Sequence, residues 1–342
     1  MRNPDQMSSW AIVLPTVFAV LTAASNATSP VAQSVEAKQI ASGHKEGIST
    51  IVFSPDARLV VSGGNDNTVK LWDVQTGQLE QMFEGHTRAI SSLDFSPDGL
   101  ILASGSFDQT IKLWDVSSRK LILMLKTSGQ VKDMSFSPDG KILASSGGDG
   151  VRLWDVGAGK LLRFLPSNRG VLTVTFSPDG KVLADAGGGG IRLWDVREGK
   201  LLRHLQGTEP ELIISVAFSP DGQVLASGGN RRMIRFWDVS TGNLKSTIDV
   251  KGDFIRAIAF SSDGRILAAA DRTSAQLWNI EKRQVQEVLS NDVLLLSIAL
   301  SPQGAIWAGG DTSGTLRLWR FRSQVAACDV PRKCLSSDEA SA

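Results

Sequence analysis

The sequence of 342 residues has no tyrosine, only three histidines and only two cysteines. The chain therefore offers few histidines and thiols from which a zinc site, or an active site that pairs a nucleophile with histidine, could be built. The formal net charge of +1 gives no long-range attraction to nucleic acid or to an anionic membrane. These absences argue against a metalloenzyme and against a nucleic-acid-binding protein.

Long apolar runs are also scarce, because only residues 10–24, WAIVLPTVFAVLTAA, form one. Its length suits the apolar region of a signal peptide and is short for a membrane span. Ser25 and Ala27 then occupy the small-residue positions of a cleavage site, although Asp5 beside Arg2 weakens the basic region. We therefore expect a signal peptide over 1–27, a linker over 28–34 and an exported protein. The alternative is an uncleaved anchor, and only then would the chain be attached to a membrane.

The two cysteines, Cys328 and Cys334, lie in a polar C-terminal tail over 323–342. In an oxidising compartment they could close a disulfide, and otherwise they are two free thiols. Their spacing does not match a zinc site, so no metal is expected.

A Trp that is usually followed by Asp recurs at intervals of 40 to 43 residues, and a turn sequence close to FSPDG keeps the same interval. Two markers in phase identify seven repeats. The Trp marker stands at Trp72, Trp114, Trp154, Trp194, Trp237, Trp278 and Trp319, and the turn begins at Phe53, Phe95, Phe136, Phe176, Phe218, Phe260 and Leu300.

Each repeat reads as four short strands separated by turns. In the second repeat, AISSLDF over 89–95 alternates apolar and polar residues, and SPDG then supplies turn chemistry. The segments LILAS, IKLWDV and LILMLK follow as three further strands. Four strands in a period of about 41 residues predict an all-β fold, a seven-bladed β-propeller with four-stranded antiparallel blades.

The repeats resemble the WD-repeat (WD40) family of propellers over residues 35–322. Gly-His at 43–44 and 85–86, LVVSGGNDNTVKLWDV at 59–74 and LASGSFDQTIKLWDV at 102–116 carry the resemblance. The seventh repeat stops after its third strand at 316–321, and the segment 35–41 can supply its missing outer strand. That pairing would close the ring with the two ends of the domain.

The glycine run at 187–190 raises the question of a phosphate-binding loop. A strand rather than a helix follows it, so we interpret it as a tight hairpin. The resemblance also implies buried hydrogen-bond chains, complete in the first two repeats only. The residues are His44, Ser62, Asp66 and Trp72, and then His86, Ser104, Asp108 and Trp114.

The resemblance implies that partners dock on the face that carries the loops between second and third strands. Candidate partner-binding residues on that face are Arg169, Arg231, Arg232, Phe254 and Arg272. The arginines would suit a carboxylate or an acidic peptide, and Phe254 would anchor an interface. The competing interpretation is a solvated polar rim.

The sequence thus predicts a non-catalytic, monomeric protein-interaction scaffold. It would bind a protein or peptide, with no cofactor and no nucleic acid. The alternative is an exported propeller enzyme, or a propeller that binds a small ligand or cofactor in its central channel. The regular repeats are similar to those of bacterial members of the family, which implies a bacterial protein that is periplasmic or secreted.

Overall fold

The structure, a computed structural model, describes residues 36–320 apart from 207–210, 253, 272–273, 291–293 and 303–305. These residues belong to one compact unit, 32–342. The predicted signal peptide, linker and cysteine-containing tail lie outside the described residues. In the described part, no helix has the length and apolar character needed to cross a membrane.

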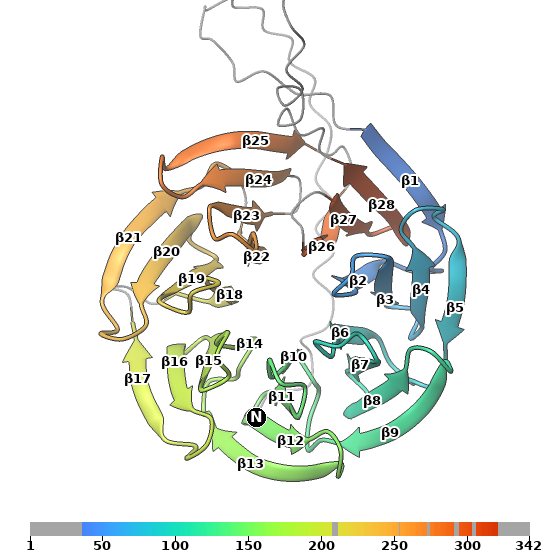
Figure 1. Cartoon of the computed structure of the whole chain (residues 1–342), viewed down its shortest axis with the longest axis horizontal. Coiled ribbons are helices and arrows are strands. Elements are labelled where there is room, and N and C mark those ends of the chain that lie inside the picture. The colour runs from blue at the N-terminus through green and yellow to red at the C-terminus, as the bar shows by residue number, and fades with distance from the viewer. Residues whose placement is uncertain are drawn as a thin grey trace, which may run out of the picture. The chain divides into compact units, whose positions relative to one another are not determined.

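Seven four-stranded antiparallel sheets are arranged in a ring (Figure 1), which confirms the predicted fold. The innermost strands of blades one to seven are β2 (Ile48–Phe53), β6 (Ile90–Phe95), β10 (Asp133–Phe136), β14 (Thr173–Phe176), β18 (Ile213–Phe218), β22 (Ala257–Phe260) and β26 (Leu295–Leu300). The second strands are β3 (Leu59–Gly64), β7 (Ile101–Ser106), β11 (Ile142–Ser146), β15 (Val182–Gly187), β19 (Val224–Gly229), β23 (Ile266–Ala270) and β27 (Ile306–Asp311).

The repeated tryptophans lie on the third strands, and the fourth strands form the outer rim of the ring. The third strands are β4 (Val69–Asp73), β8 (Thr110–Asp115), β12 (Gly150–Asp155), β16 (Gly190–Asp195), β20 (Met233–Asp238), β24 (Ser274–Asn279) and β28 (Thr315–Arg320). The outermost strands are β5 (Leu79–Phe83), β9 (Lys120–Lys126), β13 (Lys160–Pro166), β17 (Leu201–Leu205), β21 (Leu244–Asp249), β25 (Gln284–Ser290) and, in blade seven, β1 (Glu36–Ser42).

The ring is closed because the two ends of the domain contribute strands to the same blade. Strand β1 pairs antiparallel with β28, with Ala37 opposite Trp319. The last blade therefore joins the N-terminal strand to the three C-terminal ones, so the ring cannot open without breaking a sheet.

The first turn of each blade is fixed by its local chemistry. In blade three, Ser137 Oγ donates to Asp139 Oδ1 at 2.6 Å and accepts from the Ile142 N–H at 2.9 Å. Gly140 completes this turn in the left-handed region with φ 69°. The glycine run at 187–190 is likewise a hairpin, because β15 and β16 pair through Gly187 and Gly190.

The core consists of seven apolar clusters, each lying between neighbouring blades. The cluster of blades six and seven differs from the others, because alanines at 268, 270 and 275 surround Trp307. The indole of Trp307 is fully buried, and it stands where the other blades carry Val or Leu. A large side chain on one blade thus fills the space that small ones leave on the next.

Candidate functional site

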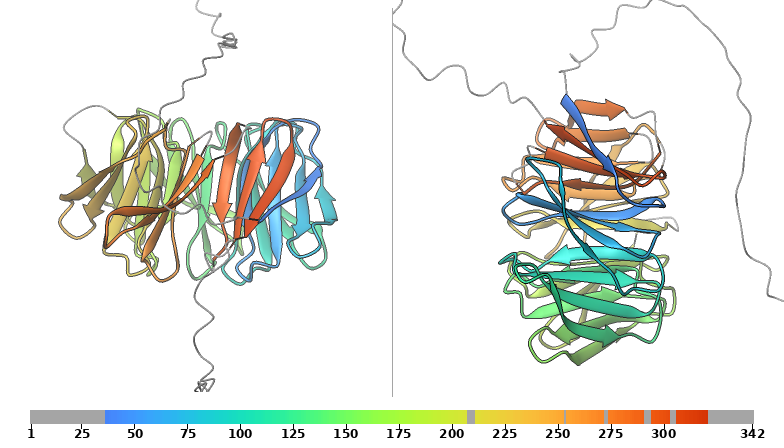
Figure 2. Two further views of the ribbon diagram at one scale, coloured as in Figure 1. Left: turned by 90° about the horizontal axis from the view of Figure 1, so that it is seen from above. Right: turned by 90° about the vertical axis from the view of Figure 1, so that its right-hand side faces the viewer.

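One face of the ring carries the hairpins between second and third strands together with the connections between blades. We call it the loop face, and the opposite face, which carries the SPDG turns, the turn face (Figure 2). Backbone hydrogen bonds join the two kinds of loop. Asn65 N donates to Gly47 O at 2.9 Å, and Phe107 N donates to Ala89 O at 3.1 Å.

Beneath the loop face of blade one, four side chains form one hydrogen-bonded chain. Trp72 Nε1 donates to Ser62 Oγ at 2.9 Å, and His44 Nε2 lies 2.8 Å from the same oxygen. His44 Nδ1 lies 2.9 Å from Asp66 Oδ1, which also accepts from the Thr68 hydroxyl at 2.7 Å. The chain fastens the inter-blade connection to the hairpin and to the core tryptophan.

Blade two repeats this geometry with the same distances. Trp114 Nε1 to Ser104 Oγ is 2.9 Å, His86 Nε2 to Ser104 Oγ is 2.8 Å, and His86 Nδ1 to Asp108 Oδ2 is 2.9 Å. The structure therefore brings together the residues of both chains that the resemblance implied.

Burial lowers the pKa of His44 and of His86 more than their carboxylate partners raise it. Burial would raise the pKa of Asp66, but hydrogen bonds from His44, Lys45 N and Thr68 outweigh it and hold that pKa at about 2. The histidines are therefore neutral and the aspartate is ionised at neutral pH. Acid weakens both chains, because the unfolded state takes up these protons at a higher pH than the folded state.

In each blade, the residue two positions before the repeated Trp pairs across the sheet with a residue of the second strand, as Lys70 pairs with Ser62. We call this residue of the second strand the serine position. In blades one, two, three and five it is serine, and Ser145 and Ser227 accept from Trp154 and Trp237 at 2.9 and 2.8 Å. Blade four has Asp185 there, which accepts from Trp194 Nε1 at 2.9 Å and from Arg192 through two bonds of 2.8 Å each. An Asp–Arg pair thus replaces the Ser–His pair, which motif spacing did not reveal.

Blade six has Ala269 at this position, opposite Gln276. Among the described residues, the buried Trp278 Nε1 has no hydrogen-bond partner. An indole N–H in that state has lost its water without gaining an acceptor.

Ala269→Ser is expected to stabilise the protein by about 1 kcal/mol, because the new hydroxyl would accept from Trp278 as serine does in four other blades. The matched control is Ala268→Ser, on the neighbouring buried alanine, which packs in a different cluster and should be destabilising. Urea unfolding of the two variants checks this, and an Ala269→Ser protein no more stable than the parent would contradict it.

Four of the predicted partner-binding residues lie on loops of the loop face in blades three to six. Arg169 is exposed and packs against the glycine hairpin at Gly189, and Arg232 is exposed with φ 52°. Arg231 is half-buried, and Phe254 is exposed. Arg272 lies outside the described residues.

Three exposed apolar side chains share one register position on this face. Leu212, Phe254 and Leu294 are 40%, 45% and 46% exposed, and each directly precedes the buried first residue of its blade's inner strand segment. The corresponding residues in blades one to four are Gly47, Ala89, Gln130 and Gly170. Large apolar residues are thus confined to three consecutive blades, five to seven. An alignment of the seven repeats at this position identifies Leu212 and Leu294 from the sequence. They are absent from the predicted partner-binding residues, which are arginines and Phe254.

The hairpin that carries Arg231 and Arg232 is bonded to the connections on both of its sides. Leu212 N donates to Asn230 Oδ1 at 3.1 Å, and Asn230 N donates back to Leu212 O at 3.2 Å. On the other side, Ile255 N donates to Gly229 O at 2.9 Å. These bonds hold the two arginines between Leu212 and Phe254, so apolar and cationic groups adjoin. We call Leu212, Arg231, Arg232, Phe254 and Leu294 the loop-face patch.

A cavity of about 400 Å³ lies where the innermost strands of blades three to six end at the turn face. The innermost strands of blades three to six line it with phenylalanines, prolines and small residues. None of the described residues that line it is titratable. In the described part of the chain, no three His, Cys, Asp or Glu side chains gather to hold a metal.

Two family models match the chain. The one described as the first beta-propeller of IFT122 covers residues 47–187, and the WD domain, G-beta repeat, covers 199–238 and 242–279. Subunit I of eukaryotic translation initiation factor 3 from Phaeosphaeria nodorum is 49% identical over 37 residues, 11% of either chain. Protein Mut11 from Chlamydomonas reinhardtii is 50% identical over 36 residues, 10% of either chain. The chain therefore spans about a tenth of the length of these curated relatives.

Fold and loop geometry define a β-propeller of the class that generally serves as a platform for protein interactions. The repeats, the closed ring of seven blades and the family matches all indicate the same protein family. The chain belongs to the WD-repeat (WD40) family of seven-bladed β-propellers.

The predicted location is wrong. The curated proteins that match come from eukaryotes, and one of them is by name a translation initiation factor subunit, so they do not support a bacterial, periplasmic or secreted protein. The prediction rested on one apolar stretch with a weak basic region and on the similarity of the regular repeats to bacterial members of the family. Apolar composition alone does not distinguish a signal peptide from other apolar segments. The argument for a disulfide between Cys328 and Cys334, which lie outside the described residues, falls with it.

Proposed function

We propose that this protein is a non-catalytic scaffold that binds a partner protein or peptide through the loop-face patch. The observation that carries the proposal is the exposure of Leu212, Phe254 and Leu294 at one register position of three consecutive blades. Loop residues are free to vary without disturbing the core, so three large apolar side chains in solvent there mark an interaction surface.

The chemistry of the patch suggests which partner fits. Apolar anchors beside arginines suit a segment that carries an apolar side chain together with a carboxylate, because a guanidinium pairs with a carboxylate through two parallel hydrogen bonds. Arg169, on the connection before blade four, adds an exposed cation on the same face. Arg272, which the sequence predicts for this face, lies outside the described residues. Among the described residues, the Glu211 carboxylate pairs with the buried Arg235 and is itself only 6% exposed, so it offers little repulsion to an acidic partner.

A pull-down with the full chain as bait tests the proposal, with the parent compared with Leu212→Ser/Phe254→Ser/Leu294→Ser. We expect a partner that the parent retains to be lost from the triple variant, with at least about a tenfold weaker affinity when measured with the purified partner. The matched control is Leu100→Ser, because Leu100 is an exposed leucine in a turn of the turn face.

A second variant, Arg231→Glu/Arg232→Glu/Arg272→Glu, tests the cationic component and should weaken an acidic partner most at low salt. Circular dichroism checks that each variant is folded. If the triple serine variant binds the same partners as the parent does, the loop-face patch is not the binding site.

A further inference from the structure

Exposed apolar side chains gather on the outer rim of three consecutive blades. The described residues include fifteen large apolar side chains that are exposed, and eight of them lie on β9, β13 and β17. They are Leu121, Ile122 and Met124 on β9, Leu161, Leu162 and Phe164 on β13, and Leu201 and Leu202 on β17. Figure 1 shows these three strands following one another around the rim. A patch of this extent is more than scattered surface leucines.

The same three strands differ in charge from the other four. Within β9, β13 and β17 there is no acidic residue, and the basic residues are Lys120, Lys126, Lys160, Arg163 and Arg203. Each remaining outermost strand has an acidic residue, namely Glu36 in β1, Glu80 in β5, Asp249 in β21 and Glu287 in β25. Because the seven outermost strands occupy equivalent positions in one fold, the difference in their charged residues does not arise from a difference in their place in the fold. We call β9, β13 and β17 the basic rim.

The backbone of the basic rim can accept another strand. Each of these strands is the last of its sheet and pairs on one side only, with β8, β12 or β16. An edge of this kind presents N–H and C=O groups to an incoming extended chain. Strand β13 ends in Pro166, which has no N–H, so a new strand would pair with the earlier part of β13.

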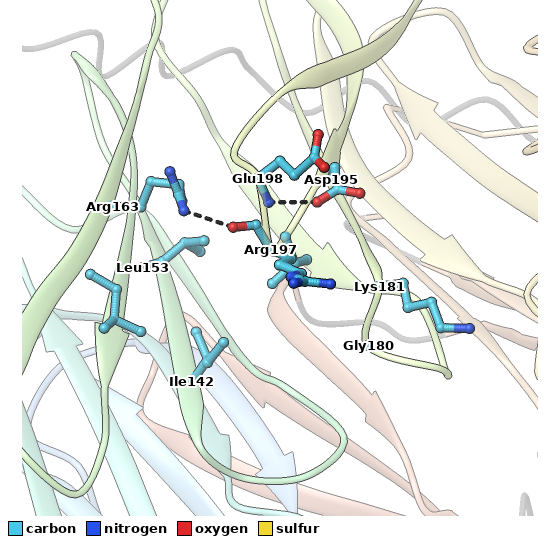
Figure 3. Close-up of a pocket in the computed structure, with 10 residues that line it drawn as sticks. Ile142, Leu153, Arg163, Gly180, Lys181, Asp195, Arg197 and Glu198 are labelled. Atoms are coloured by element: carbon cyan, nitrogen blue, oxygen red, sulfur yellow. Dashed lines mark hydrogen bonds between the residues drawn. The ribbon is translucent and has the colours of Figure 1, made fainter.

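A groove of about 670 Å³ lies beside β13, between blades three and four (Figure 3). Ile142, Leu153 and Leu162 give it apolar walls. Three cations, Arg163, Lys181 and Arg197, and two carboxylates, Asp195 and Glu198, also line it. Arg163 Nη2 donates to Arg197 O at 2.7 Å, which fixes the guanidinium at the groove.

The two arginines of the groove have no acidic partner in the described part of the chain. The ion pairs of blades three and four join Arg152 to Asp149, Lys181 to Asp179, and Arg192 to Asp185. Blade two is different, because Arg119 at its rim pairs with Glu80 of blade one at 3.0 Å. The groove between blades three and four therefore combines apolar walls with three cations and two carboxylates, and its two arginines form no ion pair among the described residues.

We infer that the basic rim is a second binding surface, for an extended segment of a partner protein in which acidic and apolar residues alternate. The segment adds as a strand along β13, places an apolar side chain in the groove and sets carboxylates against Arg163 and Arg197. Charge complementarity selects this occupant, because a second copy of the chain would bring the same cations. A flat lipid surface fits less well, since the three strands follow a convex arc and lipid cannot pair with a strand edge.

This surface lies on the circumference of the ring and not on the loop face. A partner on the rim leaves the loop-face patch open, so the propeller can hold two partners at once. The inference does not depend on the proposed function of the loop face.

A fluorescein-labelled peptide of four Val-Glu repeats, titrated into the full chain at low salt and followed by fluorescence anisotropy, tests this inference. We expect saturable binding that weakens about tenfold or more in Arg163→Glu/Arg197→Glu. A second variant, Arg197→Glu alone, changes a side chain that makes no ion pair in the described part of the chain and should weaken binding in the same direction. The matched control is Lys245→Glu on β21, which should change the dissociation constant by less than about twofold.

Two further probes separate the occupants. A Val-Glu peptide that is N-methylated at alternate residues should lose binding, because it cannot pair with a strand edge. A Val-Lys peptide should not bind.

The inference is overturned if the charge-reversed protein binds the Val-Glu peptide as the parent does, or if the N-methylated peptide binds equally well. It is also overturned if vesicles of phosphatidylserine and phosphatidylcholine bind and the peptide does not, since the rim would then be a membrane surface. The triple serine variant of the loop-face patch should bind the peptide normally, which keeps a failure here distinct from a failure there.

Discussion

Asp185→Ala is expected to destabilise the propeller by about 3–5 kcal/mol, because it leaves Arg192 without its buried partner. The carboxylate is 1% exposed, and it accepts two bonds from Arg192 and one from the Trp194 indole. Burial raises the pKa of Asp185, and the guanidinium of Arg192 opposes that shift. Removal of the carboxylate also leaves an indole N–H unsatisfied, which adds to the loss.

Urea unfolding followed by tryptophan fluorescence measures the free energy of unfolding of the parent and the variant. Asp185→Ser is the matched control, because serine at this position accepts from the tryptophan in four other blades while it still removes the partner of Arg192. Its loss should be smaller than that of alanine. A loss below about 1 kcal/mol for Asp185→Ala would show that the pair contributes little.

Asp94→Asn is expected to stabilise the protein by about 2–4 kcal/mol at pH 8.5 and to change it little at pH 4. Asp94 lies on the innermost strand β6, where its Oδ2 accepts from Phe136 N of blade three at 2.7 Å. Burial, with Asp133 nearby, raises the pKa of Asp94 from 3.8 to about 7 despite this hydrogen bond. Asparagine keeps an oxygen for the same N–H and cannot ionise.

The direction of this change in stability follows from the pKa of Asp94 in the unfolded and in the folded state. Between pH 3.8 and about 7 the folded state binds more protons at Asp94 than the unfolded state does, so its stability falls as the pH rises through that range. The acid sensitivity of His44, His86 and Asp66 runs in the opposite direction, but it is common to parent and variant and cancels in their difference. Urea midpoints of both proteins at pH 4 and pH 8.5 make the measurement. An equal difference at the two values would show that Asp94 does not titrate in this range.

Some features of the candidate site could be predicted from the sequence and others could not. The His44 and His86 chains could be predicted, because the resemblance to WD-repeat propellers implies them at these positions. The pairing of Asp185 with Arg192 could not, since a motif search expects serine and histidine there and neither is present. Trp307 falls outside the repeated tryptophans, and only the alanines of the neighbouring blade explain its burial. The predicted location was wrong because neither an apolar stretch nor the regularity of the repeats determines where a protein is located.

The number of blades, the four strands in each and the closure of the ring could all be predicted from the amino-acid sequence. Repeat length, strand alternation and turn chemistry are local properties, so they can be read along the chain. Only the tertiary structure decided which residues meet between blades. Leu212, Phe254 and Leu294 form a patch, and β13 borders a groove, because blades about 41 residues apart pack side by side. An alignment of the repeats can identify such positions one by one, but their arrangement side by side depends on how the blades pack.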